Sequence, residues 1–488
     1  MPPGDPTDII AAEVAVVGAG VAGLYAALTA AEAGAQVTVI SATPLAQTAS
    51  YWAQGGLAAA LAVDDSPELH LEDTEKAGRG LMRPSAAEVL VREAPAMIGE
   101  LQRLRVRFDA DRNGNLALGL EGGHSRRRIV HAGGSATGRR VARQLSADLV
   151  HHRNVRILEG SRAASLWRGD DGRVIGVVCE NGLAVHARGT VLATGGAAAL
   201  WSRTTNPPGS LGIGILLARA AGAAVADMEF VQFHPTAVTG VPGREGFLVT
   251  EAIRGEGATL HGPDGERFVE ELAPRDEVSR AVWEVMRTQD VPSVSLDMRG
   301  VDPARFPNVV EALRDSGLDP LRELVPVAPA SHYVMGGVVT DLVGSTGVPG
   351  LYVVGESACT GLHGANRLAS NSLSECVVFG ARAARGALEE PAAGPLPARA
   401  PAPEPLELPS RETREALWRE AGIVRTREGL ERLLGDPHPL AQLVARCALL
   451  REETRGAHVR LDFPATEPGL DRMHGVARGG EPAFERWS

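Results

Sequence analysis

The chain has 488 residues, which is too long for a single hydrophobic core and predicts two or three domains. Its net charge of −11 argues against general binding to nucleic acids, because such binding favours a basic protein surface. The cysteines stand far apart, without CxxC or metal-ligand spacing, and are expected to be reduced thiols of a cytoplasmic protein that holds no metal: Cys179, Cys359, Cys376 and Cys447.

The N-terminal sequence MPPGDPTDII carries acids where a secretory signal peptide needs basic residues. The chain has no run of about 18 uncharged apolar residues, so no membrane-spanning helix is expected. Lys76 is the only lysine, and it lies in the charged stretch EDTEK. Schiff-base chemistry such as that of pyridoxal phosphate enzymes is therefore not expected.

A nucleotide-binding pattern stands near the N-terminus. An apolar run at residues 13–17 precedes the turn GAGVAG, an Ala/Leu-rich helical segment follows, and a second strand is expected at 36–40. Gly18, Gly20 and Gly23 would let backbone approach a pyrophosphate at the start of the helix. The alternative is a tight turn that only packs closely. Ser41 stands where an acid that binds the NAD ribose is expected, which favours FAD.

Two later segments, GTVLATGG at 189–196 and GLYVVGE at 350–356, each read as a strand that enters a glycine turn. They indicate one flavin domain whose sequence is split by an inserted domain. Residues 389–410 form a Pro/Ala-rich linker, and a helical pattern follows from Arg411 to Glu453. The expected fold is α/β: a Rossmann-like FAD-binding domain (1–227 and 334–400), an α+β capping domain (228–333), and a linker with a C-terminal helical domain (401–488).

Several motifs, in this order along the chain, resemble the L-aspartate oxidase family of the succinate dehydrogenase/fumarate reductase flavoprotein superfamily: YWAQGGLAA, EGGHSRRRIVHAGGSATGR, EFVQFHPT, TEAIRGEG, APRD, HYVMGG and GANRLASNSL. The resemblance runs from Glu13 to Pro464. It implies FAD-dependent oxidation of L-aspartate to iminoaspartate, the first step of bacterial de novo NAD synthesis. Oxygen or fumarate would take up the electrons, with succinate as the product of fumarate, and quinolinate synthase is a possible functional partner.

The substrate has two carboxylates and one ammonium group, and forked guanidinium donors suit carboxylates. The resemblance assigns substrate binding to Gln232, His234, Thr250, Glu251, His332 and Arg367. Arg367 follows a glycine-rich stretch with no acid near it in sequence, so it is expected to hold a carboxylate from outside the chain. His234 by itself is equally well read as a structural histidine.

The expected catalytic residues are Arg275, Glu121 and Arg254. In the superfamily an arginine at the position of Arg275 moves a proton at the substrate carbon, and a second clamp on the substrate is the alternative. Arg254 is expected to orient the substrate or Glu251. Glu121 is expected to hold the ammonium group, because related fumarate reductases usually carry a neutral glutamine there. The alternative is that it pairs with Arg126 or Arg127 on a surface loop.

Binding of FAD is expected to involve four groups of residues: Gly18, Ala19, Gly20, Val21, Ala22, Gly23 and Ser41; Ala49, Ser50, Tyr51, Trp52, Ala53, Gln54, Gly55 and Gly56; Ala163, Thr194, Gly195 and Glu356; and Asn371, Ser372 and Leu373. Asn371 and Ser372 begin an expected helix whose positive end would face the flavin, and they also fit an ordinary N-cap.

Two positions bear on how FAD is attached and bound. Ala49 stands where covalently flavinylated relatives have a histidine, so FAD is expected to be noncovalent. Ile213 replaces an aspartate that the family often has near FAD, and the helical domain is short between Leu433 and Leu440. The rival functions are a fumarate reductase or succinate dehydrogenase-type flavoprotein, and a flavin-binding regulator without catalysis.

Overall fold

The computed structural model describes residues 9–45 and 48–488. Residues 1–8, which supply most of the argument against a signal peptide, lie outside these ranges. A five-stranded sheet in the order β18-β11-β2-β3-β7 lies at the centre of the nucleotide-binding part, and all its strand pairs are parallel. Its strands are β2 (Val14–Val17), β3 (Val37–Ser41), β7 (Val155–Glu159), β11 (Gly189–Leu192) and β18 (Leu351–Val353). The four strand segments that the sequence indicated, at 13–17, 36–40, 189–196 and 350–356, therefore share one sheet.

The glycine turn joins β2 to helix α1 (Val21–Glu32). Gly18 has φ +109°, and a Cβ there would lie 2.2 Å from the Ala193 carbonyl oxygen. A Cβ on Gly23 would lie 2.0 Å from the Gly18 carbonyl oxygen. These glycines are required because backbone packs against backbone, which is the geometry expected of a Rossmann-like turn.

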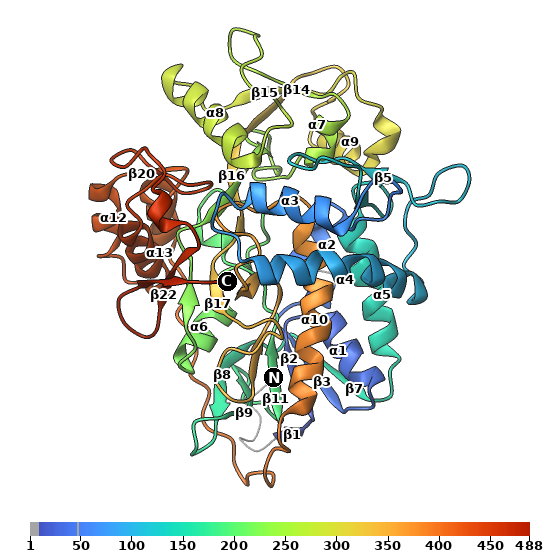
Figure 1. Ribbon diagram of the computed structural model, residues 1–488, viewed down its shortest axis with the longest axis vertical. Helices are drawn as coiled ribbons and strands as arrows, with labels where there is room; N and C mark the ends of the chain where they lie inside the picture. Colours follow the sequence, from blue (N-terminus) through green and yellow to red (C-terminus); the bar gives the residue numbers. More distant parts are fainter. Residues whose placement is uncertain (1–8, 46–47) are drawn as a thin grey trace.

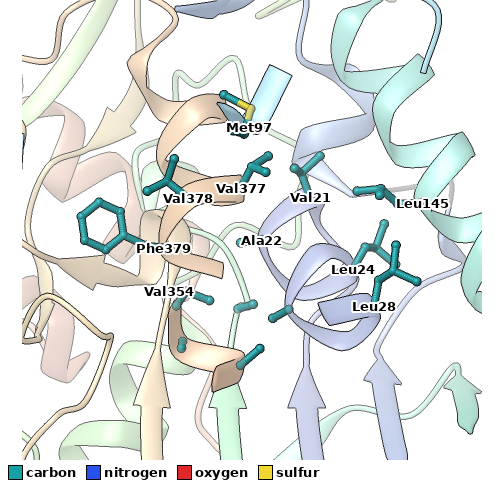
Figure 2. Close-up of a cluster of buried hydrophobic side chains, with 14 of the residues drawn as sticks. Val21, Ala22, Leu24, Leu28, Met97, Leu145, Val354, Val377, Val378 and Phe379 are labelled. Atoms are coloured by element: carbon teal, nitrogen blue, oxygen red, sulfur yellow. The ribbon is translucent and has the colours of Figure 1, made fainter. Parts of the chain in front are cut away.

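Helix α10 (Asn371–Glu389) packs along α1, and both cover one face of the parallel sheet (Figure 1). Figure 2 shows the side chains at this contact, among them Leu24 and Val377, which are buried. The helices approach closely because Gly380 has no side chain, and a Cβ there would lie only 2.9 Å from the Ala22 carbonyl oxygen.

The remaining elements of the nucleotide-binding part surround this core. A second sheet has the order β1-β10-β9-β8, and a three-stranded sheet has the order β4-β6-β5. Their strands are β1 (Ile9–Ala11), β4 (Leu57–Ala58), β5 (Leu118–Gly119), β6 (Ile129–Val130), β8 (Ala163–Arg168), β9 (Val174–Cys179) and β10 (Ala184–His186). The helices are α2 (Ala49–Trp52), α3 (Pro67–Ala77), α4 (Pro84–Arg103), α5 (Thr137–Val150) and α6 (Ile213–Ala220).

An α+β unit is inserted between β12 (Val225–Ala226) and β17 (Gly337–Val339) and lies at the top of Figure 1. Its antiparallel sheet has the order β13-β16-β15-β14 and its own apolar core. It consists of β13 (Val231–Val238), α7 (Glu251–Gly255), β14 (Thr259–His261), α8 (Arg275–Thr288), β15 (Val294–Asp297), α9 (Pro307–Arg314) and β16 (Val325–Val334).

The C-terminal part contains the expected helices, α11 (Arg411–Glu420), α12 (Arg427–Leu433) and α13 (Pro439–Leu450). It also contains strands that the helical pattern did not predict: β20 (Val424–Arg425), β21 (Val459–Arg460), β22 (Met473–Ala477) and β23 (Ala483–Arg486). Strand β22 pairs with β12 in a sheet that ends at β19 (Ala358–Cys359), so this part joins the rest of the molecule through a shared sheet. The exact domain boundaries stay a prediction. Among the described residues, none of the helices combines the length and apolarity that crossing a membrane requires.

Candidate active site

A cavity of about 670 Å³ lies where the start of α1, the start of α10 and the inserted sheet meet. This volume is within the usual range for cofactor and substrate sites. Its wall contains many of the residues expected from the sequence: Ala22, Ala49, Ser50, Trp52, Ala53, Gln54, Gly55, Gly56, Glu121, Gly195, His234, Thr250, Glu251, Arg275, His332, Glu356, Arg367, Ser372 and Leu373.

Other expected residues do not line the cavity. They are Gly18, Ala19, Gly20, Val21, Gly23, Ser41, Tyr51, Ala163, Thr194, Gln232, Arg254 and Asn371. Several of them support residues of the wall. Two of them point elsewhere: Ser41 donates its hydroxyl to the Thr43 carbonyl at 2.6 Å, and Ala163 pairs with Cys179 across the second sheet.

Ser50, from a distant part of the chain, hydrogen-bonds the N-terminus of α1. Its Oγ accepts a hydrogen bond from the Val21 N–H at 3.1 Å, and Gly20, the N-cap of α1, has no side chain that could do so. Ser50 lies in the short helix α2, which Thr48 caps. The positive end of α1 thus faces the cavity through Ala22, as binding of a phosphate requires.

The turns after β11 and β18 are joined by side chains. The Thr194 hydroxyl accepts from the Gly214 N–H at 3.0 Å and lies 3.1 Å from the Ser357 hydroxyl, which donates to the Gly195 carbonyl at 2.8 Å. Glu356 accepts from the Val334 N–H at 3.0 Å, and burial raises the pKa of its carboxyl to about 7. These contacts fix the wall of the cavity opposite α2.

The start of α10 combines backbone strain with buried hydrogen bonds. Ser370, its N-cap, has φ +61°, an uncommon value for a residue other than glycine. Its hydroxyl accepts from the Gly56 N–H at 3.1 Å and donates to Glu121 Oε2 at 2.6 Å. The Asn371 side chain points away from the cavity, to His70 at 2.8 Å and Thr74 at 3.1 Å. Its predicted contact with the cofactor therefore does not involve its amide.

Gln232 lies between two arginines. Its Oε1 accepts from Arg275 Nη1 at 3.1 Å and from Arg367 Nε and Nη2 at 3.3 and 3.2 Å, while its Nε2 donates to Asn366 and to the Arg367 carbonyl, both at 2.8 Å. Gln232 thus uses its amide to hold both cations in place instead of facing the cavity. It is a supporting residue in this geometry.

Glu251 has two arginines beside it. Arg275 Nε donates to its Oε2 at 2.5 Å, Arg254 Nη2 lies 3.6 Å away, and the Gly122 N–H donates to its Oε1 at 2.8 Å. Although burial disfavours the charged carboxylate, the two guanidinium groups hold the pKa of Glu251 below its ordinary value. Arg254 also donates to the Glu271 carbonyl. It contacts Glu251 from outside the cavity, and its role in orienting Glu251 or the substrate stays a prediction.

Arg367 has no carboxylate at ion-pairing distance among residues 9–45 and 48–488, unlike Arg275 and Arg254. Its Nη1 donates to the Ser372 hydroxyl at 2.8 Å. Burial and the charge of Arg275 lower its pKa to about 10, so it stays charged at neutral pH. An incoming anion would be its natural partner.

His234 and His332 meet with their ring centroids 5.1 Å apart. Burial and the charge of Arg275 lower the pKa of both imidazoles well below its ordinary value, so both are neutral at neutral pH. The Thr236 N–H donates to His234 Nδ1 at 3.3 Å, which leaves the proton on Nε2. A Thr205 hydroxyl lies 2.8 Å from His332 Nδ1. Each ring can therefore donate one hydrogen bond to an anion.

Glu121 is 2% exposed. Its Oε2 accepts from the Ser370 hydroxyl, and its Oε1 has no partner within the described ranges. Arg126 instead donates to the carbonyls of Asp64 and Ser125. The buried position does not agree with the alternative of a surface ion pair. Thr250 is the N-cap of α7 and contributes to the same wall.

The sequence analysis missed part of the cavity wall: Thr204, Thr205, Asn206, Pro207, Pro208, Gly243, Arg244, Glu245, Gly246, Phe247, Leu248, Tyr333, Ser370 and Cys376. Most of them come from the stretches TTNPP and GREGFL, which connect regular elements and carry no periodic pattern. Tyr333 was inside the quoted motif HYVMGG, directly after His332, and could have been noted as an aromatic neighbour of the site.

The residues present fit a flavin dinucleotide. The cavity combines the positive ends of α1 and α10 with Gln54, whose buried Oε1 has no partner among residues 9–45 and 48–488. A glycine turn without room for side chains lies directly before α1. The chain matches the family described as "FAD binding domain" over residues 13–373, and "Fumarate reductase flavoprotein C-term" over residues 434–478.

Solved structures of similar fold agree with these family matches. E. coli quinol fumarate reductase is similar with a TM-score of 0.86 and 28% identity, over 98% of this chain and 96% of that chain. Mycobacterium smegmatis Sdh1 is similar with a TM-score of 0.82 and 29% identity, over 99% and 95% of the two chains. The fold and the site thus define an FAD-dependent flavoprotein oxidoreductase of the fumarate reductase class. The expected α/β fold, with capping and C-terminal domains, and the FAD cofactor are confirmed.

Curated relatives define the family more narrowly. The chain is 44% identical to the L-aspartate oxidase of Caulobacter vibrioides, over 96% of this chain and 97% of that protein. It is 42% identical to the L-aspartate oxidase of Streptomyces coelicolor, over 98% of this chain and 84% of that protein. The chain belongs to the L-aspartate oxidase family, as the resemblance of its motifs implied.

Proposed function

We propose that this protein oxidises L-aspartate to iminoaspartate with FAD, as the first step of de novo NAD biosynthesis. The observation that carries the proposal is the charge pattern of one cavity. Arg367 offers a positive charge without a carboxylate partner in the described ranges, and Glu121 offers a buried carboxylate with a free oxygen. L-Aspartate supplies the complementary groups, which are two carboxylates and one ammonium.

Binding follows from these complementary charges. Arg367 and the N–H groups of the neutral His234 and His332 hold the substrate carboxylates. Glu121 holds the ammonium group, and the Ser370 hydroxyl at 2.6 Å keeps its carboxylate in place. A charge-assisted hydrogen bond is worth about 1.5–3 kcal/mol, so this contact alone can separate aspartate from succinate.

Oxidation removes a hydrogen with its electron pair from Cα and a proton from the nitrogen. When FAD is bound, it accepts the hydrogen and the electron pair. The chain orients Cα through the carboxylate contacts and leaves Glu121 beside the nitrogen. In the reverse type of reaction, reduction of fumarate, Arg275 would supply the proton to the second carbon, with Glu251 holding its guanidinium at 2.5 Å. A second clamp on the substrate remains the alternative role of Arg275.

The electron acceptors, the functional partner and the cellular location belong to this proposal as well. Oxygen and fumarate as electron acceptors, succinate as the reduced product, a functional link to quinolinate synthase and a cytoplasmic location rest on the family resemblance. A succinate dehydrogenase-type flavoprotein is the second candidate, favoured by the structural similarity to E. coli quinol fumarate reductase. That candidate would use the same carboxylate contacts and would not need the charge of Glu121.

The test is reduction of the flavin by substrate. The FAD-loaded protein is mixed without oxygen with L-aspartate or with succinate, and the flavin absorbance is followed. L-Aspartate should bleach the flavin, and fumarate added afterwards should restore its colour. Bleaching by succinate but not by L-aspartate would contradict the proposal in favour of the second candidate.

Two variants separate binding from chemistry in the same assay. Arg367→Leu should lose the change in the flavin spectrum that succinate binding causes. Arg275→Leu should keep that change, because the carboxylate contacts remain, and should lose reoxidation of the reduced flavin by fumarate, because the proposed proton donor is gone. If the two variants behave alike, the division of roles between the two arginines is wrong.

A further inference from the structure

The Arg367 guanidinium lies over the face of an aromatic ring. Its Cζ is 4.8 Å from the ring centroid of Tyr333, and both residues are buried, at 5% and 6% exposure. This is within the distance at which a cation is attracted by the negative face of an aromatic ring, and the attraction is strongest where water is excluded. The ring therefore stabilises a charge that no carboxylate of the described ranges neutralises.

The ring belongs to a cross-strand pair that holds the guanidinium from two directions. Tyr333 on β16 stands opposite Gln232 on β13. Gln232 Oε1 accepts from one edge of the guanidinium, through Nε and Nη2, while Tyr333 supports its face. Arg367 itself comes from the segment before α10. The pair thus fixes the guanidinium of the nucleotide-binding part against the inserted sheet.

The phenol is held in turn by a buried polar cluster on the side away from Arg367. The Tyr333 hydroxyl donates to Glu375 Oε2 at 3.1 Å and lies 3.2 Å from His363 Nε2. His363 Nε2 is also 2.9 Å from Glu375 Oε2, and the Thr360 hydroxyl donates to Glu375 Oε1 at 3.2 Å. Burial and the nearby carboxylates raise the pKa of the Tyr333 hydroxyl well above its ordinary value, so the ring stays neutral.

We propose that Tyr333 is a positioning residue for substrate binding, which holds the Arg367 guanidinium in place through its ring face while leaving the positive charge free for a substrate carboxylate. A carboxylate in the position of Tyr333 would also hold Arg367, but it would compete with the substrate for the same charge. A neutral ring does not compete. This inference rests on the proposed role of Arg367 and extends it to a residue that no motif of the sequence assigned.

The test compares variants by their dissociation constants for succinate, read from the change in the flavin spectrum, and by KM and kcat for L-aspartate. Tyr333→Leu removes the ring and should weaken succinate binding and raise KM about ten- to thirtyfold. Because its effect is on binding, kcat at saturating L-aspartate should fall by less than about threefold.

Tyr333→Phe is the conservative rescue. It keeps the ring, and Glu375 keeps His363 and Thr360 as partners. Succinate binding should therefore stay within about threefold of that of the original protein. If Phe and Leu weaken binding equally, the hydroxyl or the fold matters and the proposal fails.

A matched control is Tyr352→Leu. Tyr352 is equally buried at 6% exposure, but it bonds Gly386 and Glu390 and lies off the cavity wall. Its removal should leave the succinate dissociation constant unchanged, and an effect as large as that of Tyr333→Leu would contradict the proposal.

If Tyr333→Leu does not fold with FAD, the ring can be weakened without changing its shape. Added fluorine atoms on the ring of the Tyr333→Phe variant reduce the negative charge of the ring face, so the dissociation constant should rise with each fluorine. A constant value across the series would overturn the inference. Failure of L-aspartate to bleach the flavin would instead contradict the proposed oxidation, while the succinate measurements would still test Tyr333.

Discussion

At the scale of single residues, the charged side chains of the site differ in whether an opposite charge lies beside them. Arg275 is paired with Glu251 at 2.5 Å, whereas Arg367 has a ring, an amide and a hydroxyl around it. Glu121 is held by one hydroxyl, and its other oxygen has no partner among the residues that the structure describes. A paired charge orients its neighbour, and an unpaired buried charge is available for the substrate.

The variant Glu121→Gln tests the residue that is proposed to recognise the ammonium group. The amide can still accept from Ser370, so the site should stay folded, but the charge is lost. We expect kcat/KM for L-aspartate to fall about ten- to a hundredfold, which corresponds to about 1.5–3 kcal/mol. Reduction of fumarate by the same preparation should stay nearly intact, because fumarate has no ammonium group. A parallel loss of both activities would show that Glu121 is structural.

At the scale of elements, the site depends on where helices begin. Helices α1 and α10 both start at the cavity and pack against each other. The start of α10 is also held from α3, where His70 Nε2 lies 2.8 Å from Asn371 Oδ1. Burial and the neighbouring His124 lower the pKa of His70 to about 3, so the folded protein keeps this ring neutral.

This contact predicts a dependence of stability on pH. The pKa of His70 is lower in the folded state than its ordinary value of 6.5, so the unfolded chain binds the proton more readily below pH 6.5. The stability that the protein gains from a neutral His70 is therefore fully present above that pH and is lost as the pH falls towards 3. Between pH 7 and pH 5 the loss amounts to about 2 kcal/mol.

His70→Gln should make the free energy of unfolding less sensitive to acid by that amount, since a glutamine amide can bond Asn371 without titrating. Denaturant titrations at pH 7 and pH 5 measure the difference. An unchanged difference between the two pH values would assign the acid sensitivity to other groups.

Helix α6 gives a second prediction at this scale. Ile213 is its first residue, and the N–H of the next residue, Gly214, donates to Thr194 in the turn after β11. An acid at this position is favoured by the helix dipole and would restore the aspartate of related proteins. Ile213→Asp should tighten FAD binding about ten- to a hundredfold in titrations of the apoprotein, and the neutral control Ile213→Asn should tighten it less. Equal or weaker binding by the aspartate variant would contradict this prediction.

At the scale of the whole molecule, the nucleotide-binding part and the inserted unit supply opposite halves of one cavity. Arg367 comes from the first and His234, Arg275 and His332 from the second, so the proposed substrate contacts require both parts. The C-terminal part is tied to them by β22, which pairs with β12. Arg451, in the same part, bonds the buried Glu229 at 2.7 Å, next to the start of the inserted sheet.

The protein as a whole should release its flavin on denaturation. Ala49 lies on the cavity wall in place of the histidine to which relatives attach FAD, and alanine cannot form that bond. After precipitation with acid, all of the yellow colour should be in the supernatant. Flavin that stays in the washed pellet would contradict noncovalent binding.

The sequence by itself determined the nucleotide-binding unit and predicted many of the residues that line the cavity. Local spacing was enough for the turn at Gly18, Gly20 and Gly23, because strand, turn and helix follow one another directly in the chain. The longer motifs with Arg275, His332 and Arg367 indicated the type of reaction, since together and in this order they resemble one family. The helices after Arg411 were visible in their apolar periodicity.

Only the tertiary structure decided which partner each polar group has. Gln232 is turned to two arginines, Asn371 to His70, and Tyr333 lies under Arg367. These contacts join positions that are far apart in the sequence, so no local pattern encodes them. The same reason applies to strand β22, whose pairing with β12 depends on a distant partner. Sequence spacing specifies which helix, strand or turn a segment can form by itself. The free energy of burying a charge or of pairing the edge of a strand depends instead on the groups that the fold places beside it.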